Sequence, residues 1–388
     1  MARLRIDIAL LLILLSPAVA GAQELFVNVG ENFMTTARPI TKFVMEPRRF
    51  QTVDVGIFWK TSDTETARLY GFPRFGIGFS YANLSPLECR GSSRMGDSYA
   101  LYMHLDREFL QWGIFSAGYN IEYGIGLMTH YSDRYENYWN KLYGGPIANH
   151  AELGLFSRLQ VSEHLAFRAE VNYRHKSSGR LYVPNSGLNA ISCALGVHYA
   201  VGEHTLKPGG RRPAEDLLDK RFRVAVFAGG GVHRCMAEFK ADFEFPKEER
   251  QPSYTPWFKG SVGAEVNWRY ARRTATGVQM EFFYLSNTEA LRRADDILYG
   301  PAERKYSPFA AGIGLTQDLY YGSFTAGVGV GAYLFRKVGQ HEDHGRLYQK
   351  VTLRYFPPAL KRVFAGIAIR THLFSQADYM ELSIGTIL

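Results

Sequence analysis

The chain has 388 residues, a formal net charge of +8 and 14% aromatic residues, among them 24 Tyr and 26 Phe. Beyond its first residues it has no apolar run of the roughly 18 residues that a transmembrane helix needs, so a helical membrane protein is excluded. The aromatic residues and the 38 glycines are instead typical of a chain with many strands, as in a membrane β-barrel.

The N-terminal residues have the pattern of a secretory signal peptide. Arg3 and Arg5 precede an apolar run at residues 8–15, and small residues follow up to Ala22. We therefore expect residues 1–22 to be removed and the mature chain to be exported. An exported basic protein is suited to meet anionic lipid or lipopolysaccharide phosphates rather than nucleic acid.

Segments rich in aromatic and β-branched residues around glycines then follow, as expected of strands. In the first half of the chain the sequence predicts strands at residues 50–60, 74–83, 98–106, 109–118 and 121–130. The aromatic and charged stretch THYSDRYENYWNKLYGGP comes next. Its length is typical of an extracellular barrel loop rather than of a periplasmic turn.

Two later segments alternate between apolar and polar residues with a period of two. Within Glu163–Ser177 the odd positions 165–173 are apolar and the even ones almost all polar, and within Asn189–Val201 the odd positions 191–201 are again apolar and the even ones small or polar. In a soluble sandwich the apolar face would be the core, whereas in a membrane barrel it contacts lipid and the polar face lines the interior. The signal peptide and the number of such segments favour the barrel.

A Pro/Gly-rich charged connector at residues 202–220 separates the two halves. Strands are predicted after it near residues 257–270, 278–284, 308–318, 322–335, 346–356, 361–373 and 379–388. The predicted fold is all-β, an antiparallel up-and-down transmembrane barrel, either one of about 16 strands or two in tandem of about eight each. The expected divisions are the signal peptide 1–22, a first half 23–201 that carries the site, the connector 202–220 and a second half 221–388.

His175 and Ser177 are two residues apart at the end of one predicted strand, so they share a face, and Asn189 begins the next strand. If Ser177 lies opposite Asn189, the imidazole sits between a hydroxyl and an amide. That is the arrangement of a nucleophile, a base and an orienting residue. All three positions are odd and continue the apolar face, which predicts a site on the outer wall of the barrel, at the rim of the bilayer, for a lipid substrate.

Other candidates are weaker. His372 lies near Ser375 and Asp378 in the sequence, but it falls on the polar face of its strand and is expected to line the lumen. His341 and His344 read as a solvated turn rather than as metal ligands. The three cysteines have no zinc-type spacing. No cofactor and no metal ion are therefore expected.

The stretch HKSSG followed by PNSGLN resembles the HxSNxG and PNxGL signature of the outer-membrane lipid A 3-O-deacylases, in their longer, acyloxyacyl hydrolase-like form. The resemblance implies a β-barrel esterase that acts on lipid A or lipopolysaccharide in the bacterial outer membrane. It assigns the general base to His175, the nucleophile to Ser177 and the orienting residue to Asn189. The oxyanion stabilisers that it implies are Asn185 and a backbone N–H of Gly179 or Arg180.

Two residues depart from that family's pattern. Ser178 stands where the family usually has Asn, and Asn189 stands where type members have an acidic residue, whose charge would stabilise the imidazolium. An Asn orienter fourteen residues after the His is what outer-membrane phospholipase A uses, with calcium, so that family is an alternative. A non-catalytic pore or structural barrel is another, and assembly into a homo-oligomer stays open. PNSGLN favours the deacylase.

Overall fold

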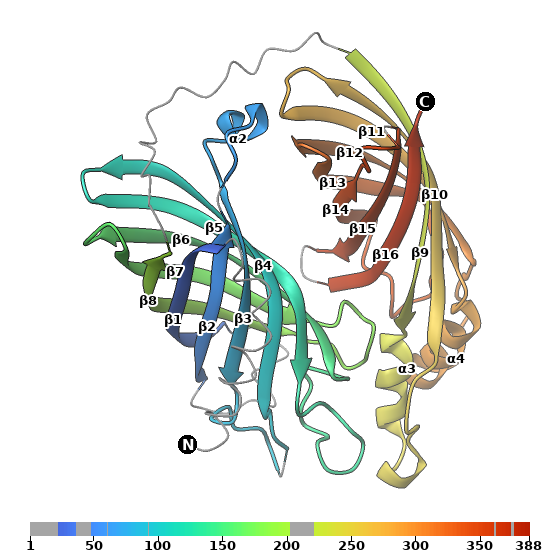
Figure 1. The fold of residues 1–388 in the computed structure, drawn as a ribbon. Helices are drawn as coiled ribbons and strands as arrows, with labels where there is room; N and C mark the ends of the chain where they lie inside the picture. Colours follow the sequence, from blue (N-terminus) through green and yellow to red (C-terminus); the bar gives the residue numbers. More distant parts are fainter. Residues whose placement is uncertain are drawn as a thin grey trace. The chain divides into compact units, whose positions relative to one another are not determined.

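The computed structural model describes residues 22–35, 48–59, 61–91, 93–201, 221–360, 362–373 and 376–388. They form two closed antiparallel barrels of eight strands each, so the tandem arrangement is the observed one (Figure 1). Residues 1–21 of the predicted signal peptide and the predicted connector 202–220 lie outside the described residues. The chain divides into two compact units, and the short segment Gly179–Asn185 belongs to the second unit together with the second barrel.

In the first barrel each strand pairs with the next along the chain, and the last strand closes on the first. The connections at residues 84–96, 129–146 and 178–187 lie at its long-loop end, whereas the opposite end has the short turns at 113–114 and 161–164 and the longer connection at 60–73. The long-loop end is the extracellular one in barrels of this kind. The strands are β1 (Ala22–Met34), β2 (Arg49–Trp59), β3 (Arg74–Asn83), β4 (Asp97–Trp112), β5 (Phe115–Met128), β6 (Ile147–Gln160), β7 (Leu165–Ser177) and β8 (Leu188–Ala200), with a short helix α2 (Glu65–Leu69) between β2 and β3.

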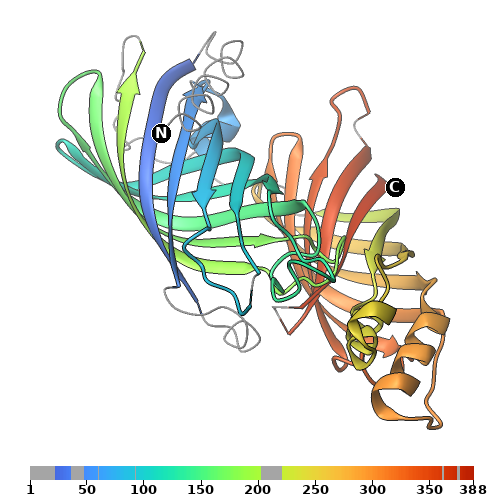
Figure 2. The same ribbon diagram turned by 90° about the horizontal axis from the view of Figure 1, so that it is seen from below.

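The second barrel repeats this meander and closes between its last and first strands. Its strands are β9 (Arg221–Arg234), β10 (Pro256–Arg269), β11 (Thr274–Leu285), β12 (Phe309–Tyr321), β13 (Phe324–Phe335), β14 (Leu347–Tyr355), β15 (Val363–His372) and β16 (Gln376–Ile387). Helices α3 (Met236–Ala241) and α4 (Thr288–Tyr299) lie together at one end of this barrel (Figure 2), and the turns η2 (Asp242–Glu244) and η3 (Lys247–Glu249) follow α3. None of the helices described is long and apolar enough to cross a membrane.

The strand prediction was wrong in three places in the first barrel. The predicted strands at 98–106, 109–118 and 121–130 are two long strands, β4 and β5, because the chain turns only at Gly113, which has φ of 58°. β1 and β6 were missed. Their alternation is broken, since each places a large aromatic residue inside the barrel, Phe26 in β1 and Phe156 in β6.

The two faces of the barrel wall carry the residues that the alternation predicted. On β7 and β8 the odd positions face outward, with Leu195 as much as 72% exposed, whereas Arg168 and Arg174 on the even positions are buried inside. An apolar outer surface is stable only against lipid tails, and the polar side chains inside must satisfy one another. Parity therefore decides which side chains can meet the bilayer.

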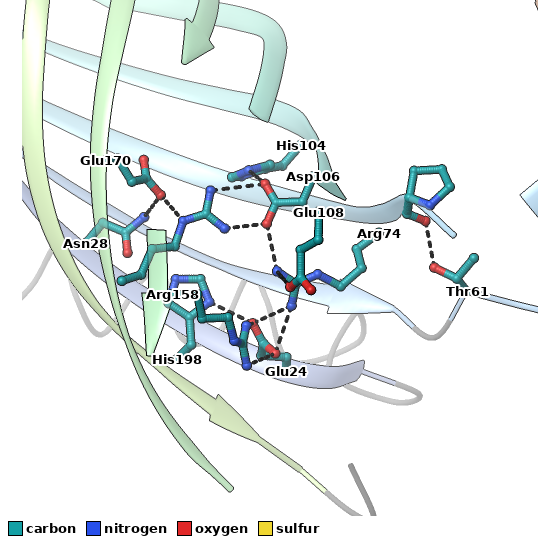
Figure 3. A network of polar contacts seen from close by, with 12 residues as sticks. Glu24, Asn28, Thr61, Arg74, His104, Asp106, Glu108, Arg158, Glu170 and His198 are labelled. Carbon is teal, nitrogen blue, oxygen red and sulfur yellow. Dashed lines mark hydrogen bonds and ion pairs between the residues drawn. The ribbon is translucent and has the colours of Figure 1, made fainter. Parts of the chain in front are cut away.

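The interior of the first barrel is held by ion pairs between strands that are far apart in the sequence (Figure 3). Asp106 is fully buried and accepts hydrogen bonds from Arg168 and from Arg74, the latter at 2.9 Å, and contacts the His104 ring at 2.7 Å. Glu24 bridges Arg74 and Arg158 in the same layer. These contacts join the strands across the lumen, so the wall presents a fixed outer surface.

Asp106→Asn should lower the free energy of unfolding of the first barrel by about 3 kcal/mol, because it removes a buried carboxylate that two guanidinium groups share. The urea midpoint, followed by the gel mobility of unheated samples, measures this loss. Asp63→Asn is the matched control, since Asp63 forms an ion pair with Arg68 that is largely exposed, at 2.8 Å. It should leave the midpoint unchanged. A wild-type midpoint for Asp106→Asn would contradict the role given to this network.

Candidate active site

The candidate trio lies where β7 ends and β8 begins, at the long-loop end of the first barrel. The strand register differs from the prediction: His175, not Ser177, lies opposite Asn189, and Ser177 lies opposite Asn149 on β6. The observed pairing of β7 with β8 is shifted by two residues from the predicted one. Such a shift keeps every side chain on its face, so the trio still shares the outer face of the wall.

The three side chains form one hydrogen-bonded chain. His175 Nδ1 lies 2.6 Å from Asn189 Oδ1, and His175 Nε2 lies 2.9 Å from Ser177 Oγ. A carboxamide oxygen only accepts, so Nδ1 carries the imidazole proton. Nε2 is then left with its lone pair toward the Ser177 hydroxyl, whose proton it accepts. A neutral imidazole in this tautomer is the form that acts as a general base.

The trio is set in the apolar wall but is not fully open to the outside. Ser177 is 5% exposed, while Tyr173, four residues earlier on the same face of β7, is 46% exposed. Gly187 lies close against Ser177 and His175, since a Cβ there would lie 3.2 Å from Ser177 Cβ and 3.4 Å from His175 Cε1. Its φ of 68° also favours glycine. Gly187 therefore leaves room for the His175 and Ser177 side chains.

Tyr173 is a residue of this site that sequence reasoning missed. Its hydroxyl donates a hydrogen bond of 2.8 Å to Asn189 Oδ1, the atom that also accepts from His175. The signal was present in the sequence, because Tyr173 has the same parity as His175 and precedes it by two residues. With two donors on its oxygen, the Asn189 carboxamide is fixed with Oδ1 toward the imidazole.

The residues that the resemblance assigned to the oxyanion lie in the segment Gly179–Asn185 of the second unit. Gly179 and Arg180 have φ of 58° and 67°. The Arg180 side chain is buried and donates a hydrogen bond of 2.8 Å to Glu342. The backbone carbonyl of Arg180 accepts from the backbone N–H of Arg234. The role of Gly179, Arg180 and Asn185 in catalysis stays a prediction.

The weaker candidates lie elsewhere. His372 is buried inside the second barrel, as expected of a lumen-lining residue, and its Nε2 lies 3.0 Å from the Tyr333 hydroxyl. Asp378 forms an ion pair with Lys259, and Ser375 lies outside the described residues. His341 Nδ1 lies 2.9 Å from the Tyr299 hydroxyl, and His344 lies beside Glu342.

One group among the described residues could hold a metal ion by its spacing: Glu122, His150 and Glu152, buried in the first barrel. These side chains already have partners in the structure. His150 Nε2 lies 3.3 Å from Glu122, and Arg174 lies 2.7 Å from Glu152. We interpret the group as part of the polar interior that holds the barrel closed.

Comparison with solved structures gives outer-membrane barrels. The enzyme PagL matches with 14% sequence identity and a TM-score of 0.29, over 45% of this chain and 97% of that one. Neisserial surface protein A matches with 9% identity and a TM-score of 0.28, over 46% and 96%. No curated protein sequence matches the chain.

Comparison with protein families gives two matches that follow each other along the chain. The model of the lipid A 3-O-deacylases (PagL) matches residues 51–198, which include the candidate trio. The model of the acyloxyacyl hydrolase C-terminal domain matches residues 221–386, which make up nearly all of the second barrel. The chain belongs to the lipid A 3-O-deacylase family, whose members are deacylases of the bacterial outer membrane.

Proposed function

We propose that this protein hydrolyses an ester-linked acyl chain of lipid A, with Ser177 as nucleophile, His175 as general base and Asn189 as orienting residue. The observation that supports this most is the hydrogen-bonded chain from Asn189 through His175 to Ser177 on the lipid-facing wall. A hydroxyl is a weak nucleophile at neutral pH, and an adjacent base in the right tautomer activates it.

In the proposed reaction His175 Nε2 takes the Ser177 proton while Oγ bonds to the ester carbonyl carbon. The carbonyl electron pair moves onto oxygen and forms the oxyanion. When the tetrahedral intermediate collapses, the bond to the sugar oxygen breaks and that oxygen takes the proton from His175. Water, activated by His175 in the same way, then releases the fatty acid from Ser177.

Asn189 fixes the imidazole by accepting its Nδ1 proton, but it carries no charge to stabilise the imidazolium that forms. We expect it to supply orientation without the electrostatic contribution of an acid. The oxyanion donors that the resemblance implies, Asn185 and an N–H of Gly179 or Arg180, are proposed for the same step.

The position of the trio defines how the substrate arrives. Around the trio the outer face carries exposed apolar side chains such as Ile147, Tyr173 and Ile191. Lipid A in the outer leaflet has acyl chains that lie along such a surface and ester bonds near the headgroup, at the height of the rim. The bilayer thus delivers the ester to Ser177, and the proposal needs no deep pocket.

An outer-membrane phospholipase A-like activity is the second candidate, because that family also uses an Asn, at the position of Asn189, to orient its catalytic His. The two activities differ in substrate and in their need for calcium. The lipid A deacylase reaction proposed here uses only groups of this chain and requires no cofactor. Lipid A and phospholipid offered in parallel, with calcium and with a chelator, separate the two. Release from lipid A in chelator supports the deacylase, and calcium-dependent release from phospholipid supports the alternative.

Ser177→Ala and His175→Ala should each leave a folded barrel and lower the release of fatty acid from lipid A by at least about a thousandfold, because each removes a group that acts in every turnover. Fatty acid release by the full-length protein in detergent micelles is the measurement, and gel mobility of unheated samples reports folding. Full activity in either folded variant would rule out the assignment. A bilayer conductance without release from the wild type would instead favour a pore.

Tyr173→Phe should lower kcat about fivefold with little change in KM, because it removes one hydrogen bond, worth about 1 kcal/mol, that holds Asn189 toward the imidazole. Tyr199→Phe is the matched control, since Tyr199 is also an outward tyrosine of this strand pair but stacks on His164 at the other end of the strands. It should behave as the wild type. Equal effects of the two substitutions would remove the positioning role from Tyr173.

A further inference from the structure

We propose that Asn149 is a further catalytic residue, whose side-chain amide donates an N–H to the oxyanion that forms when Ser177 attacks the ester. Tyr123 positions this amide. The inference rests on the proposed function, because it needs Ser177 to be the nucleophile. Asn149 has no counterpart in the sequence motif, and it would act in addition to any donor from Gly179–Asn185.

The strand register places Asn149 directly opposite Ser177. The two are Cα partners on β6 and β7, and both lie on the outer face, because the neighbouring residues Ala148 and Lys176 are buried inside. Opposite residues on one face of an antiparallel pair have Cβ atoms about 4.5 to 5.5 Å apart. The carboxamide of Asn149 is therefore the side chain that flanks Ser177 from the β6 side.

The orientation of this carboxamide follows from its other neighbour. The Tyr123 hydroxyl, on β5, donates a hydrogen bond of 3.3 Å to Asn149 Oδ1. β5 and β7 lie on opposite sides of β6. In a planar carboxamide the oxygen and nitrogen point to different sides, so with Oδ1 held toward β5 the amide N–H groups are turned toward β7 and Ser177.

His175 and Asn149 occupy different sides of the nucleophile. His175 approaches Ser177 Oγ along β7, at 2.9 Å, and takes its proton. The electron pair displaced from the carbonyl must go to an oxygen that points away from this base. A donor from the neighbouring strand β6 is placed to meet that oxygen, and a neutral amide costs less than a cation on a wall that contacts lipid.

The two asparagines of the site thus have the same kind of partner, a tyrosine hydroxyl, but use opposite ends of the carboxamide. Each has its Oδ1 hydrogen-bonded by a tyrosine on the outer face, Tyr173 for Asn189 and Tyr123 for Asn149. Asn189 acts through its oxygen, which accepts the imidazole proton. Asn149 acts through its nitrogen. A change from Asn to Asp keeps the first task and abolishes the second.

Asn149→Asp should therefore lower kcat for fatty acid release from lipid A by about 100- to 1000-fold with little change in KM, because it replaces the donor with a carboxylate that repels the oxyanion. Asn189→Asp should instead raise kcat, since Asp still accepts from His175 and adds a charge that stabilises the imidazolium. Tyr123→Phe should lower kcat only severalfold. All are measured on the full-length protein in detergent micelles.

Asn149→Leu keeps the inference testable if the charge of Asp on the outer wall prevents folding, because Leu suits a lipid-facing position and also lacks the donor. It too should lower kcat by about 100-fold or more in a folded barrel. A wild-type kcat for folded Asn149→Leu would overturn the inference. A wild type that releases no fatty acid from lipid A would instead overturn the proposed function, so the two failures are distinguishable.

Discussion

The period of two in an antiparallel strand is the constraint on which the rest of this structure depends. Once β7 and β8 close into a barrel wall, every odd residue of these strands faces the bilayer and every even one faces the interior. His175, Ser177 and Asn189 are polar residues that continue an apolar face. They can reach a lipid ester because of this parity, and a shift of one residue would turn all three into the lumen.

The interior of the first barrel makes this outer site possible. Arginine, glutamate and histidine side chains of different strands pair across the lumen, as around Asp106 and Glu24, so the wall is braced from within. Catalytic side chains need fixed positions, and strands of a closed sheet provide them better than loops. The site therefore needs few supporting groups of its own, chiefly Tyr173 on Asn189 and the small Gly187 beside Ser177.

Much of this could be predicted from the sequence. The alternation gave the face of each residue on β7 and β8, and the motif identified the three side chains that meet. The register was not predictable, because a loop of ten residues between Ser177 and Leu188 allows several pairings of the same parity. Asn149 and Tyr123 could not be found for the same reason: they come from strands whose alignment with Ser177 only the closed sheet fixes. β1 was missed because Phe26 packs into the lumen, against the expected pattern.

Mass spectrometry of lipid A from cells that contain the wild-type protein or Ser177→Ala tests the central claim most directly, since a lost acyl chain reports the substrate and the broken bond together. The wild type should yield lipid A that lacks one ester-linked acyl chain, whereas Ser177→Ala, present in the outer membrane at the same level, should leave lipid A intact. Identical lipid A from both cells would contradict the claim that Ser177 on the outer wall of this barrel hydrolyses lipid A.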